Sequence, residues 1–232
     1  MPYTTFKQGI RDCLPTVLGY AGVGFSFGIV SVASGFNILE ILLLSLLVYA
    51  GAAQFIIIAL IAVQTPIWVI VLTAMIVNSR MFLLSMTLAP NFKHDHFIHR
   101  VGVGVGSLLT DETFAVAITP YSKGHTMTYQ WIYGLNLLAY LFWALVTVLG
   151  GLLGDFFQHP EVFGLDYAIT AMFIFLAISQ FEGITKSKLR VYLYLVAIVI
   201  VMMLLLSLFL PSYLAILLAS TLSATIGMVI DR

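Results

Sequence analysis

Charged residues are scarce in this sequence. Asp, Glu, Lys and Arg make up 9% of the 232 residues, whereas an ordinary soluble domain has about 25%. Hydrophobic residues make up 61% of the chain, and a soluble fold of this size has too little interior to bury so many of them. The composition therefore predicts an all-α integral membrane protein.

Cysteine and clusters of basic residues are also lacking. Cys13 is the single cysteine, which excludes an internal disulfide and any metal site built from cysteines. The ten Lys and Arg residues are scattered and balanced by ten acidic residues, so no basic surface for nucleic acid is predicted. We expect no metal and no cofactor. Because no polar stretch is long enough for a soluble domain, residues 1–232 are predicted to form a single polytopic transmembrane domain.

Eight apolar segments are long enough to be transmembrane helices, each of which takes about 20 residues. They are residues 15–35, 39–62, 66–89, 101–119, 130–153, 165–182, 190–209 and 211–230. The first run is too long for a cleaved signal sequence and is interpreted as a retained span. The residues before Cys13 are interpreted as a short interfacial helix. Very short connections at 63–65 and 210–211 predict two antiparallel hairpins.

Basic residues give the orientation, because Lys and Arg accumulate in cytoplasmic loops. Lys7 and Arg11 precede the first span, and Lys186 and Lys188 lie six crossings later, hence on the same side. The sequence therefore predicts a multi-pass membrane protein with a cytoplasmic N-terminus. The 91–100 loop disagrees, because it is basic and would lie outside after three crossings.

Two topologies remain open. In the first, all eight segments cross fully and the basic loop is an exception to the rule. In the second, 39–62 and 101–119 are broken or re-entrant helices that enter and leave by one face, which moves the 91–100 loop inside. Broken helices at membrane depth occur only where they line a cavity or are buried in protein.

Glycines are concentrated in "GYAGVGFSFG", residues 19–28. Gly24 and Gly28 have the spacing that lets two helix backbones approach closely, and Gly19 and Gly22 lie beside them. The segment is interpreted either as a helix-packing surface or as an unwound section beside a substrate. In "VYAGAAQF", residues 48–55, Gly51 precedes the amide of Gln54. This segment is interpreted either as a packing site, where the buried amide hydrogen-bonds to neighbouring helices, or as a helix break whose free backbone amides bind a carboxylate.

Polar side chains inside apolar runs are the candidates for function. Asn78 and Arg80 lie near the middle of the 66–89 segment, where a guanidinium is costly in a bilayer. Asn136 is a further amide in mid-span, for which hydrogen bonding between helices is the simpler interpretation. We interpret Arg80 either as half of a structural ion pair or as an anchor for a substrate carboxylate.

Asp111 and Glu112 are adjacent carboxyls in "LLTDETFAV", residues 108–116. Neighbouring residues on a helix point about 100° apart, so we expect one to pair with Arg80 and the other to face water or a cavity. A carboxyl in an apolar environment exchanges a proton more readily near neutral pH, as a proton-coupled carrier requires. The alternative is that the pair belongs to a helix cap.

The ordered motifs resemble those of the AzlC family, the large subunit of bacterial branched-chain amino acid exporters. They are "GYAGVGFSFG", "YAGAAQF", "VNSRMFLLSMTLAP" and "LTDETFA". The resemblance implies secondary export of valine, leucine, isoleucine or methionine, driven by antiport of protons or another ion. It also implies a small hydrophobic partner subunit of the AzlD type. Met81 stands where the family often has histidine, so a role for that histidine is in doubt here.

No enzyme is predicted, because the motifs of intramembrane aspartyl, serine and zinc proteases are absent from the sequence. A passive membrane channel or a structural membrane subunit is the alternative to an exporter. The candidates for substrate binding or proton coupling are Gln54, Asn78, Arg80, Asp111, Glu112 and Asn136.

Overall fold

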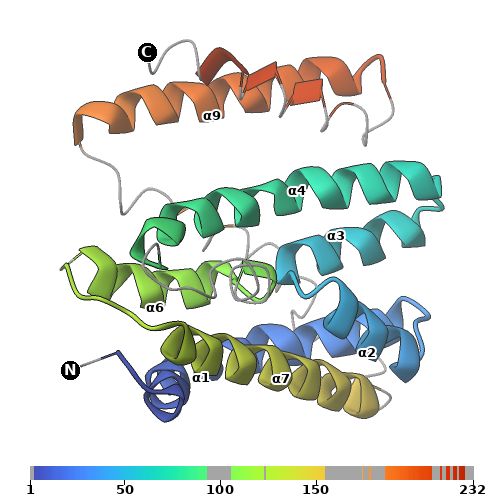
Figure 1. Ribbon diagram of the computed structural model, residues 1–232. Coiled ribbons are helices and arrows are strands. Elements are labelled where there is room, and N and C mark those ends of the chain that lie inside the picture. Colours follow the sequence, from blue (N-terminus) through green and yellow to red (C-terminus); the bar gives the residue numbers. More distant parts are fainter. Residues whose placement is uncertain are drawn as a thin grey trace. The chain divides into compact units, whose positions relative to one another are not determined.

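The computed structural model describes residues 3–92, 106–122, 124–154 and 186–210, together with ten single positions between 174 and 227. These residues form seven α-helices and one short 3-10 helix, and the described ranges contain no strand (Figure 1). The all-α prediction is confirmed. The chain divides into two compact units, residues 1–172 and 173–232. The candidate span 165–182, apart from positions 174 and 178, and most of the 91–100 loop lie outside the described residues.

Four helices among the described residues are long and apolar enough to cross a membrane. They are α1 (Phe6–Ala33), α4 (Ile67–Leu88), α7 (Tyr129–Gly154) and residues 189–207 of α9 (Lys186–Ser207). The predicted spans 66–89, 130–153 and 190–209 agree with them to within a few residues.

The start of α1 corrects a prediction. The helix begins at Phe6, so the residues before Cys13 are its first turns and not a separate interfacial helix. Thr5 caps this end, because its side chain accepts a hydrogen bond from the Gln8 backbone N–H. Pro15 lies within α1 without ending it.

Glycines bring α1 and α7 together side by side and parallel. A Cβ at Gly28 would overlap the carbonyl oxygen of Thr147, and one at Gly150 would overlap that of Phe25. Near the start of both helices, Gly9 approaches the Trp131 backbone in the same way. Since backbones in contact leave no room for side chains, only glycine fits at these positions.

The predicted span 39–62 is two helices that double back on each other. α2 (Ile38–Leu47) and α3 (Gly51–Ala62) meet at a tip formed by residues 48–50 (Figure 1). A capping box between Asn37 and Glu40 fixes the start of α2. With twelve residues, α3 is about 18 Å long, which is too short to cross about 30 Å of hydrocarbon.

Contacts with the long helices give the direction of this hairpin. We call the end of the first unit where α1 begins end A, and the end where α1 stops end B. α2 runs inward from end B, because Ile41 lies against Gly151 while Ser45 contacts Thr147. α3 returns toward end B, since Ile58 clusters with Ile41. Residues 39–62 therefore form a hairpin of two short helices rather than one long helix, the arrangement that the re-entrant alternative describes.

α6 (Asp111–Ser122) also begins at mid-depth. Its start contacts Tyr20, in the middle of α1, whereas the turn after it returns to end A, where the His125 ring contacts Tyr3. α4 likewise runs from end B to end A, and Leu88 near its last turn belongs to the cluster that contains Cys13 (Figure 1). The predicted segment 101–119 is therefore not one helix: residues 106 and 107 are helical, residues 108–110 are not, and α6 begins after the Thr110 cap.

The first unit contains the same plan twice. Each copy has a long helix and, later in the chain, a twelve-residue helix that starts at mid-depth. The first copy contains α1 and α3, with α2 between them, and the second contains α4 and α6. The two short helices begin 60 residues apart, at Gly51 and Asp111. Because α4 runs opposite to α1, the second copy is inverted relative to the first.

In the second unit, α9 packs against helical residues near the end of the chain. Ser223 Oγ lies 3.8 Å from Met202 Sδ, and Gly227 approaches Leu195. Later residues of one segment thus contact earlier residues of the other. The predicted antiparallel pairing of 190–209 with 211–230 is confirmed for the residues that the structure describes.

The glycine contact between α1 and α7 makes a prediction with a built-in control. Gly28→Ala should lower the free energy of unfolding by about 1–3 kcal/mol, because the new methyl group meets backbone that cannot move aside. Gly22→Ala should be neutral or slightly stabilising, because Gly22 has open space around it. Thermal unfolding of the purified variants in detergent measures both. Equal stability of the two variants would contradict the contact.

The hairpin of α2 and α3 predicts which residues share a side of the membrane. Single cysteines at Ser34 and Gln64, introduced into a Cys13→Ala background, should both be labelled by a membrane-impermeant thiol reagent from the same side. A cysteine at Thr4 serves as the control and should be labelled from the other side. Labelling of positions 34 and 64 from opposite sides would show that residues 39–62 cross fully.

Candidate functional site

Buried polar side chains gather where α3 and α6 begin. One group surrounds Gln54 and ties the α2–α3 hairpin to α7. The other surrounds Asp111 and Glu112 and reaches both α1 and α4. Both groups lie about halfway along α1 and α7, far from either end of the unit.

Gln54 is the centre of the first group and has no exposed surface. Its Oε1 accepts a hydrogen bond from Trp143 Nε1 at 2.9 Å, and its Nε2 donates to Ser45 Oγ at 3.2 Å. Ser45 Oγ lies 2.8 Å from Thr147 Oγ1 on α7. The amide is therefore satisfied within the protein, which is what a buried amide requires.

The hairpin tip is strained, buried and without a side-chain cap. Tyr49 has a φ of 41°, a left-handed conformation that is rare for a bulky residue. Ala50 occupies the N-cap of α3 and provides no side-chain hydrogen bond. Gly51 packs against the Trp143 ring, where a Cβ would lie 3.1 Å from Cη2. The first turn of α3 therefore presents its amides without a cap, which suits an anionic ligand group.

Thr110 and Thr113 cap the start of α6 reciprocally. The Thr110 N–H donates to Thr113 Oγ1 at 2.9 Å, and the Thr113 N–H donates to Thr110 Oγ1 at 3.3 Å. Both threonines are buried. The cap places Asp111 and Glu112 in the first turn, where the positive end of the helix dipole favours carboxylates.

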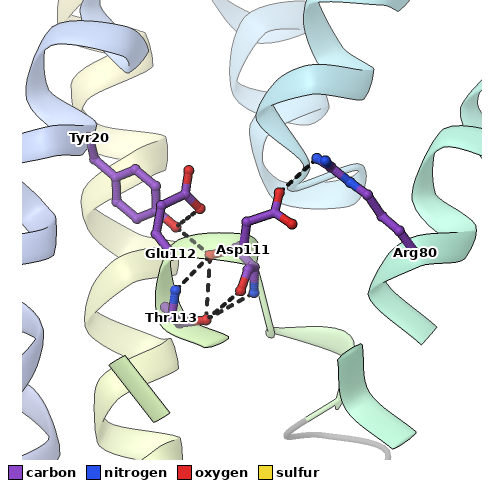
Figure 2. A network of polar contacts seen from close by, with 6 residues as sticks. Tyr20, Arg80, Asp111, Glu112 and Thr113 are labelled. Atoms are coloured by element: carbon purple, nitrogen blue, oxygen red, sulfur yellow. Dashed lines mark hydrogen bonds and ion pairs between the residues drawn. The ribbon is translucent and has the colours of Figure 1, made fainter. Parts of the chain in front are cut away.

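Asp111 pairs with Arg80 of α4 across 2.7 Å (Figure 2). The two side chains are 16% and 32% exposed, respectively. Arg80 Nε and Asp111 Oδ1 are buried and have no hydrogen-bond partner among the described residues. The predicted link between Arg80 and one of the two acids is thus present, and the pair keeps a donor and an acceptor for a further group.

Glu112 points the other way, toward α1 (Figure 2). The Tyr20 hydroxyl donates to Glu112 Oε2 at 3.2 Å and lies 2.5 Å from Thr110 Oγ1. Tyr20 is 5% exposed, and its ring meets the Trp143 ring edge-on at 5.3 Å. The two acids therefore have different partners: a permanent cation for Asp111 and a neutral hydroxyl for Glu112.

The remaining candidates lie around these groups. Asn78 is on α4, and its Oδ1 is buried without a hydrogen-bond partner among the described residues. Asn136 is fully buried on α7, one turn before Tyr140. Gly24 lies against α7, next to Gly28, while Gly19 and Gly22 face open space. α1 is continuous through all four glycines.

Sequence analysis overlooked Tyr20, Ser45, Trp143 and Thr147. An isolated Tyr or Trp in an apolar helix is typical of an interfacial anchor, and Ser and Thr can satisfy themselves on their own helix. For Tyr20, the sequence contains one signal. Tyr20 and Arg80 lie 60 residues apart, as Gly51 and Asp111 do. That period becomes visible only when the helix starts are known.

Comparison with known proteins agrees with the motifs. The family model described as AzlC protein matches residues 15–157. The chain is 30% identical to an uncharacterized membrane protein of Helicobacter pylori over 79% of this chain and 78% of the relative. It is also 30% identical to the inner membrane protein YgaZ of Escherichia coli, over 77% and 74%.

A more distant relative has a functional name. The branched-chain amino acid transport protein AzlC of Bacillus subtilis is 23% identical over 77% of this chain and 68% of the relative. No solved structure matches the chain. The matched proteins are membrane and transport proteins rather than enzymes. Since the family model covers more than half of the sequence, including both polar groups, the chain belongs to the AzlC family.

Proposed function

We propose that this protein is a secondary exporter of branched-chain and similar apolar amino acids, coupled to proton antiport. Valine, leucine, isoleucine and methionine are the expected substrates. The proposal rests mainly on one observation: the two short helices α3 and α6 start at mid-depth in an inverted repeat. Transporters commonly bind substrate at such helix starts, at the interface between inverted repeats. The name of the Bacillus subtilis relative supports amino acids as the substrate class.

The proposed topology places the α2–α3 hairpin and α6 in the inner membrane. With end A in the cytoplasm, Lys7 and Arg11 lie inside, and α4 returns the chain to that side just before Lys93 and Arg100. The basic 91–100 loop then obeys the positive-inside rule, which eight full crossings do not allow. We infer that the whole chain acts as one polytopic transmembrane domain.

A zwitterionic amino acid matches the polar groups at the two helix starts. The uncapped amides of α3 and the Arg80 guanidinium suit its carboxylate. Asp111 and Glu112, at the start of α6, suit its ammonium group or the coupled proton. The surrounding Phe, Trp and Ile side chains would contact an apolar side chain.

A small hydrophobic subunit of the AzlD type is the proposed partner. The support is membership of the AzlC family, because resemblance to that family implies a two-subunit exporter. We expect the complex to lie in the bacterial inner membrane, as the name of the Escherichia coli relative suggests for that protein.

Transport assays test the function directly. Membrane vesicles containing the full chain and its partner, preloaded with radiolabelled leucine, should release it faster when a pH gradient is imposed. Vesicles without the protein are the control. Release that is fast but independent of the gradient would indicate a passive channel, and no release of any apolar amino acid would indicate a structural subunit.

The Arg80–Asp111 pair makes a separate prediction about stability. Arg80→Leu should destabilise the protein by up to about 3 kcal/mol, the lower end of the range for buried pairs, because Arg80 is partly exposed. The double variant Arg80→Leu/Asp111→Asn should recover part of that loss, since no carboxylate remains unpaired. Thermal unfolding in detergent measures both. The matched control is Arg80→Leu/Glu112→Gln, and recovery in that variant instead would contradict the pairing.

A further inference from the structure

The two acids at the start of α6 have different kinds of partner. Only one of the partners can both donate a hydrogen bond to a carboxylate and accept one from a protonated carboxyl. Arg80 has only donors, so it stabilises Asp111 as a carboxylate and cannot accept a hydrogen bond from the O–H of a protonated Asp111. Losing the charge of Asp111 would also leave a guanidinium unpaired inside the protein, which is costly. The ion pair with Arg80 therefore favours the charged form of Asp111.

Glu112 is hydrogen-bonded to the Tyr20 hydroxyl, which in turn contacts the Thr110 hydroxyl, and each hydroxyl can both donate and accept a hydrogen bond. Tyr20 has one hydroxyl proton, which it donates to the Glu112 carboxylate while Thr110 Oγ1 lies close enough to donate to Tyr20 in turn. If Glu112 carries a proton, it can donate to the Tyr20 oxygen, and Tyr20 can then donate to Thr110. Both protonation states of Glu112 are thus hydrogen-bonded without any movement of the backbone.

We propose that Glu112, and not Asp111, is the carboxyl that exchanges the coupled proton, and that Tyr20 is its positioning residue. The inference rests on the proposed exporter function and assigns its coupling group. When the substrate ammonium reaches the start of α6, Glu112 releases its proton and pairs with the ammonium. Asp111 stays with Arg80 and fixes α6 against α4.

Other ionisable groups around this site do not replace Glu112 in that role. Tyrosine and cysteine remain neutral in an apolar interior, so they do not exchange protons near neutral pH. Arg80 stays charged throughout. Among the described residues, Tyr20, Tyr49 and Asp111 interact with Glu112 directly, and their own ionisable neighbours are Cys13, Arg80 and Tyr140.

Proton release on substrate binding tests the assignment without relying on transport. The purified full-length protein with its partner, in weakly buffered detergent solution with a pH indicator, should release protons when leucine is added. Glu112→Gln should abolish this release, whereas Asp111→Asn should still release protons. Release from Glu112→Gln with the wild-type pH dependence would overturn the proposal, as would loss of release in Asp111→Asn when leucine still binds.

Tyr20→Phe tests the positioning role and keeps the carboxyl in place. Without the hydroxyl, both forms of Glu112 lose a hydrogen bond, but the charged form loses the stronger one, so Glu112 should hold its proton to higher pH. We expect the midpoint of proton release to rise by about half to one pH unit, which corresponds to the difference between a charged and a neutral hydrogen bond. Tyr133→Phe, a matched change at a 40% exposed tyrosine on α7, should not move it. An unchanged midpoint in Tyr20→Phe would overturn the proposal.

Two outcomes separate this inference from the proposed function. If Glu112→Gln does not fold or bind leucine, Glu112→Asp and Tyr20→Phe decide, because both keep a carboxyl whose midpoint should shift. If the wild type binds leucine and drives its export with a pH gradient but releases no proton from position 112, the assignment fails and the exporter stands. If the wild type binds no apolar amino acid, the exporter and the assignment fail together.

Discussion

The close approach of α1 and α7 is the constraint on which the rest of the first unit depends. Short helices that start inside a bilayer need polypeptide around them, because lipid satisfies no backbone group. The backbone contacts of Gly28 and Gly150 provide a continuous wall of two parallel helices. Tyr20 and Trp143 project side by side from that wall, and each holds one of the two short helices in place.

The two helix starts are equivalent in position and opposite in chemistry. α3 begins with Ala50 and Gly51, which leave its amides open. α6 begins with Asp111 and Glu112, which place carboxylates at its own positive end. If the two copies of the inverted repeat had the same sequence, the two helix starts would be alike. The sequence differences between the copies therefore create one site for an anionic group and one for a cationic group, as a zwitterion needs. The proposed function follows from this asymmetry as much as from the repeat.

Much of this arrangement is predictable from local chemistry, and the part that is not has a physical reason. The long apolar runs fix α4, α7 and α9, and the cost of a charged Arg80 in an apolar segment predicts an acidic partner. The choice between Asp111 and Glu112 depends on the rotation of α6, which the Thr110–Thr113 cap and the packing against α1 set together. Local sequence cannot supply that rotation.

The direction of α3 was undetermined for the same reason. A break near Gly51 is visible in the sequence, but a broken span and a returning hairpin have the same local pattern. The contacts that decide between them join residues far apart, Ile41 with Gly151 and Gln54 with Trp143. Tyr20 was overlooked because its importance comes from Glu112, which is 92 residues away.

Backbone-to-backbone packing has a mechanical consequence. Side chains in an ordinary interface can change rotamer and let two helices slide, but carbonyl and amide groups in direct contact have no such freedom. α1 and α7 should therefore move as one stiff body during the transport cycle. In the proposed transport cycle, the shear that opens the protein first to one side and then to the other would be taken up elsewhere, at interfaces that pack through side chains.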